Sequence, residues 1–284
     1  MTVFPNPSIR VKVDPTNPGQ FFACCGLLEL ADRLFEDGAE GWFAEGGREF
    51  RIECEGTLRE LLTAAKSTTI AGMDGVAELE GNNEADDNED DDDFKPVELL
   101  SPVSLRLDWW KDKSIKTWAG SMDVHSIASA MAYAIDPHNP DPFNQCQVVY
   151  DPPKVVMRKG KRVAVKSKKR EPFYFDSRRG SSAHARDIGF SPNELSMISE
   201  AAPAVEFFCL LGLQRSRPKQ AGRPRVFHYF TWTSPLKVEL LPAALCGFLP
   251  CIAGVRYQFE NAFRTGDRKL KAYAPAIPLP LEGD

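Results

Sequence analysis

The sequence predicts an α+β protein with mixed, largely antiparallel sheets and packed helices. Short runs in which apolar and polar residues alternate indicate half-buried strands, and longer runs with apolar residues every three or four positions indicate helices. The two kinds of segment are interspersed, and no internal repeat is present. A chain of 284 residues, of which 43% are hydrophobic, is long enough to bury a full core.

Local signals predict the N-terminal elements. Residues 8–14 alternate between apolar and charged or polar side chains, which is typical of a strand. Asn17 is a favourable N-cap and Pro18 a favourable first helical residue, so a helix is predicted from this point, with Gly38 as its stop. A second strand is predicted over 49–55, where apolar residues again alternate.

The next elements follow the same logic. Thr57 and Glu60 have the spacing of a capping box, which predicts a short helix over 57–66. A strand is predicted over 103–109. A helix rich in alanine and serine is predicted over 126–135.

A long basic hairpin is the main feature predicted in the second half. A strand is predicted over 146–150, and after two prolines the segment 155–165 alternates apolar residues with bases around a Lys-Gly turn. Residues 191–194 form a capping-box pattern that opens helical structure continuing through 204–213. The last predicted strands are 226–232 and 255–259.

The chain is predicted to be one subunit over 1–284, with a division into lobes 1–150 and 151–284 as the alternative. Residues 1–10 do not resemble a secretory signal, and no apolar run approaches the roughly 18 residues that span a membrane. The seven cysteines are an odd number scattered along the chain, which indicates a reducing compartment. We therefore expect a cytoplasmic protein with no membrane partner.

Acidic residues are concentrated in one segment. Residues 74–98 contain twelve acids and one base, Lys95, and removing their net charge of −11 from the total of −5 leaves +6 on the remainder. Residues 72–94 have no apolar period and are predicted to be a disordered surface insertion. This insertion either mimics nucleic acid and covers the basic hairpin, or keeps the protein soluble. Its run Asp90–Asp93 resembles a metal site in composition only.

Basic residues dominate 154–179, where eleven bases accompany only two acids. Bases on a hairpin can follow a phosphate backbone, and each neutralised phosphate releases counterions. A solvated strand face is the alternative. The mutual repulsion of nine net charges favours a polyanionic ligand. The predicted contacts to a nucleic-acid backbone are Lys154, Arg158, Lys159, Lys161, Arg162, Lys166, Lys168, Lys169 and Arg170.

Three less crowded arginines, Arg178, Arg179 and Arg186, are predicted to contact bases or strand ends through forked hydrogen bonds. The alternative is that Arg178 and Arg179 pair with Asp176 or Asp187 inside the fold.

A second basic cluster directly precedes the aromatic run 227–232. Arginines beside aromatic rings suit the stacking of single-stranded bases. The competing interpretation is that alternate members of the run fill the core of a strand. The members of this cluster, also predicted to contact nucleic acid, are Arg215, Arg217, Lys219, Arg223 and Arg225.

The sequence predicts no catalytic site and no cofactor. It has no glycine-rich phosphate motif and no nucleophile elbow. Asp136, His138 and Asp141 could bind a metal, but the intervening prolines and Asn139 first predict a turn. The other polar and thiol candidates are interpreted as structural: the pairs Asp123–His125 and His184–Asp187, and the cysteines Cys24, Cys25, Cys246 and Cys251.

Five segments, taken together, resemble the small Csb-type subunit of type I CRISPR systems, subtype I-G (formerly I-U). The similarity covers nearly the whole chain outside the acidic insertion. The segments are Asn17–Ala31, Phe173–Arg179, Ala185–Ser191, Ala204–Pro218 and Phe230–Pro235.

The resemblance implies a subunit of a crRNA-guided, Cascade-like surveillance complex in the position of the large subunit. Such subunits meet the target double-stranded DNA beside the protospacer-adjacent motif, help to hold the opened strands, and offer a docking surface to the helicase-nuclease. The implied partners are the crRNA, the target DNA, the backbone and guide-end effector subunits, and that helicase-nuclease. In guided recognition, base pairing supplies specificity and the protein supplies phosphate contacts. The alternative function is a metal-dependent nuclease or RNA-processing enzyme that uses Asp136, His138, Asp141 or His184.

Overall fold

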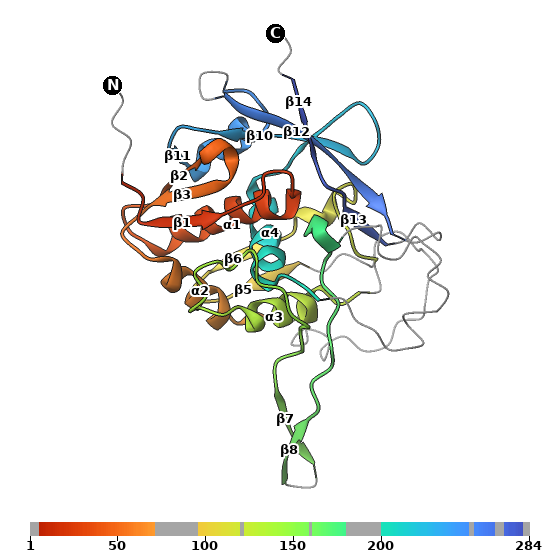
Figure 1. Ribbon diagram of the computed structural model, residues 1–284. Coiled ribbons are helices and arrows are strands. Elements are labelled where there is room, and N and C mark those ends of the chain that lie inside the picture. Colours follow the sequence, from red (N-terminus) through yellow and green to blue (C-terminus); the bar gives the residue numbers. More distant parts are fainter. Residues whose placement is uncertain are drawn as a thin grey trace.

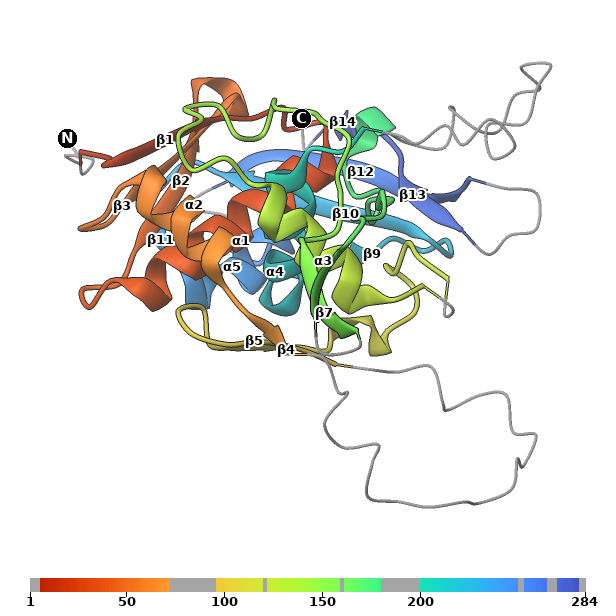
Figure 2. The ribbon, with the colours of Figure 1, turned by 90° about the horizontal axis from the view of Figure 1, so that it is seen from below.

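The computed structural model has the predicted α+β class, with two helices packed between antiparallel sheets and further helices. It describes residues 6–71, 96–119, 122–158, 161–179, 200–249, 253–264 and 270–280. The helices α1 (Pro18–Leu34) and α4 (Pro203–Arg215) lie at the centre of the molecule (Figure 1). Figure 2 shows that α2 (Leu58–Ser67) and α3 (Val124–Ala134) cover these two helices on one side, with strands of the sheets behind them.

Two antiparallel sheets make most of the β-structure. The first has the order β1-β3-β2-β11 and consists of β1 (Ile9–Lys12), β2 (Glu40–Ala44), β3 (Glu49–Glu53) and β11 (Leu236–Lys237). The second has the order β13-β12-β10-β9, with β14 also paired to β12; its strands are β9 (Lys219–Gln220), β10 (Val226–Trp232), β12 (Ala253–Phe263), β13 (Lys271–Tyr273) and β14 (Ile277–Leu279).

The remaining elements are short. A small sheet contains β4 (Ile70–Ala71), β5 (Val97–Leu99) and β6 (Leu105–Leu107), and a hairpin contains β7 (Lys154–Arg158) and β8 (Lys161–Val165). A short helix α5 (Leu241–Leu245) precedes β12. The 3-10 turns are Glu45–Gly47, Trp109–Lys111, Ser177–Arg179 and Val238–Leu240.

Helix α1 begins as its sequence predicts. The side chain of Asn17 accepts hydrogen bonds from the backbone N–H groups of Gly19 and Gln20, and Pro18 occupies the first turn. The helix ends at Leu34, before the predicted stop at Gly38, which adopts a positive φ of 74° in the following turn.

Two glycines allow α1 and α4 to touch backbone to backbone. A Cβ atom built on Gly26 would lie 1.9 Å from the carbonyl oxygen of Phe208, and one built on Gly212 would lie 2.1 Å from that of Phe22. Any larger residue at either position would therefore separate the two helices.

Aromatic side chains fill the space between α1 and both main sheets. Phe21 of α1 lies 5.4 Å from Phe43 of β2 and 4.2 Å from Tyr229 of β10, measured between ring centroids. Trp232, also on β10, lies 4.9 Å from Phe43 and donates a hydrogen bond from Nε1 to the carbonyl oxygen of Gly41. Residues from both halves of the chain therefore build one core.

Several predicted elements are confirmed. The capping box of α2 is present, with Thr57 accepting from the N–H of Glu60 and Glu60 accepting from the N–H of Thr57. Strands β1, β3 and β10 lie where they are predicted, and β12 contains the predicted strand 255–259 but is longer, from Ala253 to Phe263. Helix α3 starts two residues earlier than predicted because the side chain of Asp123 caps it.

Other predictions are wrong. The predicted strand 146–150 contains only two isolated bridges, Gln147 to Ala201 and Tyr150 to Lys169. Helix α4 does not continue from an upstream helical segment, because Ala201 forms a bridge and Pro203 starts the helix anew. The capping-box pattern at 191–194 and the whole of the acidic insertion at 72–94 lie outside the described residues.

In the part of the chain that the structure describes, no helix combines the length and the apolar character needed to cross a membrane.

Candidate nucleic-acid interface

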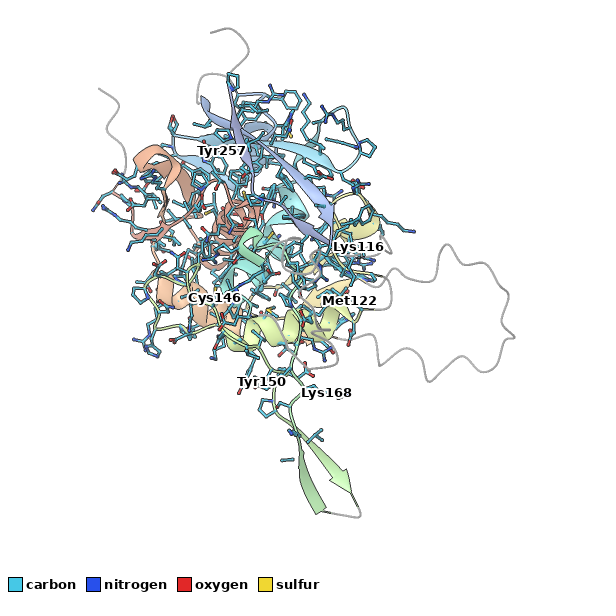
Figure 3. All side chains as sticks on the ribbon, turned by 45° about the vertical axis from the view of Figure 1, so that its right-hand side comes forward. Lys116, Met122, Cys146, Tyr150, Lys168 and Tyr257 are labelled. Carbon is cyan, nitrogen blue, oxygen red and sulfur yellow. The ribbon has the colours of Figure 1, made fainter. Side chains whose placement is uncertain are left out.

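The basic hairpin forms a two-stranded arm that projects from the body (Figure 1). Its strands pair antiparallel from Lys154 opposite Val165 to Arg158 opposite Lys161. The bridge between Tyr150 and Lys169 continues the same register toward the body. The arm is therefore one continuous ribbon, and Figure 3 shows Tyr150 and Lys168 where it leaves the body.

The arm carries nine bases and no acid between Lys154 and Arg170. Lys166, Lys168 and Lys169 are exposed at its root. Four further predicted contacts, Lys154, Arg158, Lys161 and Arg162, belong to the paired strands, and Lys159 lies outside the described residues.

One predicted contact, Arg170, ties the two strands of the arm together. Its Nε and Nη2 atoms donate to the two carboxylate oxygens of Asp151, both at 2.7 Å. These hydrogen bonds raise the pKa of Arg170. The backbone joins the same two segments, because Asp151 N donates to the carbonyl oxygen of Lys168 at 2.8 Å. Arg170 thus joins the two strands of the arm at its root.

Arg178 pairs inside the fold, which is the alternative that the sequence left open. Its Nε and Nη2 atoms donate to the buried carboxylate of Asp176, Nη1 donates to Asn144, and Nη2 also donates to the carbonyl oxygen of Phe143. Burial lowers the pKa of Arg178, but the hydrogen bonds and the charge of Asp176 outweigh it and raise the pKa overall. Four of the five N–H donors of this guanidinium are therefore used in the fold.

The two other less crowded arginines are Arg179 and Arg186. Arg179 donates from Nη2 to Glu200 at 3.2 Å. Arg186 lies outside the described residues, as does Asp187.

In the second basic cluster two arginines form ion pairs, and the three other bases are exposed. Arg215 donates from Nε to Glu29 of α1 at 2.7 Å, so it joins α4 to α1. Arg225 lies 3.6 Å from a carboxylate oxygen of Glu260 and stacks on the ring of Phe263. The other members, Arg217, Lys219 and Arg223, are exposed.

The aromatic run is divided between two faces of β10. Phe227, Tyr229 and Trp232 are buried in the core, as the competing interpretation predicted. His228 and Phe230 are half-buried on the opposite face of the sheet.

No known protein family, characterised protein or solved structure matches this chain. A proposed function therefore depends on the geometry and the charges described above, and on the resemblance of the five sequence segments.

The candidate metal ligands form a turn. Asp136 accepts a hydrogen bond from the N–H of His138, and the carboxylate of Asp141 accepts one from the side chain of Asn144. Among the residues that the structure describes, no three His, Cys, Asp or Glu side chains form a group that could hold a metal ion. His184 lies outside the described residues.

The remaining candidates have structural surroundings. Asp123 caps α3, with His125 beside it. Cys24 and Cys25 are buried on α1, and burial raises the pKa of Cys25 to about 12. Cys246 is half-buried, and Cys251 lies outside the described residues.

Sequence reasoning missed the polar residues on the open face of the second sheet. Arg256 and Gln258 of β12 contact His228, although about 30 residues separate them along the chain. A strand pairing of this range leaves no local signal. The one local signal for this polar face is the alternation within β10, in which every second residue points away from the core.

Proposed function

We propose that this protein is a non-catalytic nucleic-acid-binding subunit of a type I-G CRISPR effector complex. In this proposal it acts in the cytoplasm in antiviral defence, within a Cascade-like complex. It contacts target DNA near the protospacer-adjacent motif, the guide–target heteroduplex, or both. Its partners are the crRNA, the target duplex, the backbone and guide-end subunits and the recruited helicase-nuclease.

The projecting arm is the observation that carries the proposal. Asp151 pairs with Arg170; the other eight bases of the arm repel one another, and a phosphate backbone would neutralise that charge. The ion pair of Arg170 with Asp151 joins the two strands at the root of the arm, and the exposed Lys166, Lys168 and Lys169 lie close to it in the sequence. A ribbon of this shape can follow a groove or a backbone without reading bases, which suits a complex whose specificity comes from RNA. The resemblance described above supplies the class of complex.

The test is binding of the full-length chain to a labelled duplex of about 20 base pairs. Replacing Lys166, Lys168 and Lys169 together by alanine should weaken binding at least about tenfold. The slope of log K against log salt should become shallower by about 0.9 for each phosphate that the variant no longer neutralises. Fluorescence anisotropy between about 50 and 200 mM salt measures both.

The matched control removes three positive charges from a different part of the surface. Lys12, Arg48 and Arg59 are exposed bases of the N-terminal region, and their triple alanine variant should bind nearly as tightly as the wild type. Equal weakening in the two triple variants would contradict a role for the arm. A wild-type chain that shifts no DNA or RNA at low salt would indicate a scaffold that binds only protein.

The complex and the enzymatic alternative have their own tests. Co-purification with a guide RNA and partner subunits is expected. Magnesium- or manganese-dependent cleavage that is abolished in His138→Ala or His184→Ala would overturn the non-catalytic assignment.

A further inference from the structure

The face of the second sheet that points away from the core carries aromatic and basic side chains. The nucleic-acid contacts proposed for the arm do not involve these side chains. Strand pairing places Lys219 of β9 opposite His228, and Arg256 of β12 opposite Phe230. These side chains share the face of β10 that points away from the core. We call this set, together with Phe248, the sheet-face surface.

A hydrogen-bond network holds the middle of this surface. Arg256 Nη2 lies 2.9 Å from His228 Nδ1, and His228 Nε2 lies 2.9 Å from Gln258 Oε1. A guanidinium can only donate, so Nδ1 accepts and Nε2 carries the proton that is donated to Gln258. The imidazole is thereby fixed in one tautomer, and the Arg256 guanidinium lies 5.9 Å from the centroid of the Phe230 ring.

Phe248 is exposed to solvent, and the turn that carries it packs on the Phe230 ring. Phe248 follows Gly247, whose φ of 76° turns the chain and whose backbone rests on the Phe230 ring, since a Cβ there would lie 2.8 Å from a ring carbon. The Phe248 side chain is 66% exposed, the largest exposure among the large hydrophobic residues described. Lys219 Nζ lies 5.4 Å from the centroid of its ring. The ring therefore faces solvent beside a positive charge.

Exposed bases border the turn that carries Phe248. The backbone of Arg217 lies beside the same turn, with its carbonyl oxygen 3.9 Å from Cys246 Sγ. Arg217, Lys219 and Arg223 are exposed, and Glu239 is the only acid in the sequence between Arg215 and Phe259. From outside this range Asp108 faces Arg217: its hydrogen bond from Gln214, and then the charges of Lys111, Arg106 and Arg217, lower the pKa of Asp108. An exposed ring bordered by bases is complementary to a ligand that has both aromatic faces and phosphates.

We propose that Phe248 stacks on an unpaired base of single-stranded nucleic acid, while Lys219 and Arg217 contact the adjacent phosphates. This inference rests on the proposed function and adds a second contact to it. The arm and the second sheet lie at opposite ends of the body, as Figure 1 shows and as the positions of Lys168 and Tyr257 show in Figure 3. The sheet-face surface therefore holds a different stretch of nucleic acid from the one the arm contacts.

The test compares single-stranded and duplex probes on the full-length chain. Phe248→Ala should weaken binding of labelled oligo-dT and oligo-rU of about 20 nucleotides roughly tenfold, because the variant loses the ring on which a base stacks. Binding of the duplex probe should stay within about twofold of the wild type, because a paired base offers no free face. Phe248→Trp should bind the oligonucleotides at least as tightly as the wild type.

Two controls separate stacking from other roles of an exposed ring. Phe248→Leu keeps an apolar side chain without a π-face and should not restore binding. Leu240→Ala removes a different exposed apolar side chain, 46% exposed, and should have no effect.

Each outcome decides between the claims. If the wild type binds both probes and Phe248→Ala binds them equally well, the stacking site is excluded and the arm proposal stands. Binding by Phe248→Leu that equals the wild type would show an apolar contact only. If Phe248→Ala releases a partner subunit from the reconstituted complex but binds oligonucleotides normally, the surface is a protein contact instead. A wild type that binds neither probe refutes both proposals.

Discussion

Buried polar residues in this protein join segments that are distant in sequence. Asn17 caps α1 and also donates from Nδ2 to Asp176 at 2.7 Å, and its Oδ1 accepts from the N–H of Ser177. Glu206, in the first turn of α4, accepts from the N–H of Asp176 at 3.1 Å. The loop 173–179 is thereby tied to the N-terminal ends of both central helices.

The protonation of Glu206 should make stability depend on pH. Burial raises its pKa from 4.5 to about 8, although the N–H groups of Asp176 and Phe175 act in the opposite direction. The folded protein therefore takes up a proton between these two values, and this contribution to stability declines as the pH rises through that window. Relative to Glu206→Gln, the wild-type free energy of unfolding should fall by up to about 1.4 kcal/mol per pH unit from pH 5 to 8.

Urea denaturation at several pH values measures this difference. Glu60→Gln is the control, because hydrogen bonds from Thr57 lower the pKa of Glu60 and place its titration below that window. A difference between wild type and Glu206→Gln that stays constant from pH 5 to 8 would show that Glu206 is ionised throughout.

At the scale of elements, four of the five segments that carry the resemblance meet in the core. The segment Asn17–Ala31 forms most of α1, and Ala204–Pro218 forms most of α4. The loop Phe173–Arg179 crosses their N-terminal ends, and Phe230–Pro235 supplies Trp232 to the aromatic core. These four segments therefore supply the central helices, the loop across their N-terminal ends and part of the aromatic core. The bases of the arm, at 154–170, lie outside all of them.

The crossing of α1 and α4 should tolerate no side chain at Gly212. A Cβ there would lie 2.1 Å from the Phe22 carbonyl oxygen and 2.7 Å from Gly26 N. Gly212→Ala should lower the free energy of unfolding by about 1–3 kcal/mol or more, as overpacking does. The urea midpoint measures the decrease.

The comparison is a glycine with room around it. Gly222→Ala would meet no atom within 4 Å and should change the free energy of unfolding by less than about 0.5 kcal/mol. Similar stabilities of the two variants would mean that the helices can separate at little cost.

Elements with local signals could be predicted from the sequence, and elements defined by distant partners could not. Helices α1 and α2 have their caps within three residues of their start. Strand β2 was missed because its central Gly41, Trp42 and Phe43 are all buried and show no alternation.

The same limit applies to the candidate site. The charge of the arm is visible in the sequence, whereas the role of Arg170 is set by Asp151, which lies 19 residues before it. Arg178 is likewise fixed by Phe143 and Asn144, which only the fold brings near. A cluster of bases thus predicts a charged surface without showing which of its members are already paired.

At the scale of the whole molecule, charge is strongly separated along the chain. The net charge of −5 combines an acidic segment with a body of net charge +6 once −11 is removed. The described body presents exposed bases on the arm and at the sheet-face surface, at opposite ends (Figure 1). A nucleic acid that contacted both would have to run along the body between them.

Deleting Gly81–Asp93 separates the two interpretations of the acidic segment. The deletion removes eight acids and no base, so the net charge changes from −5 to +3. At about 150 mM salt the Debye length is about 8 Å, so a distant acidic segment changes binding little while one that covers the bases blocks it. The solubilising interpretation predicts a Kd for the duplex within about twofold of the wild type at this salt, together with lower solubility. Tightening of about tenfold or more would instead show that the segment masks the bases, because direct cover persists when long-range attraction is screened.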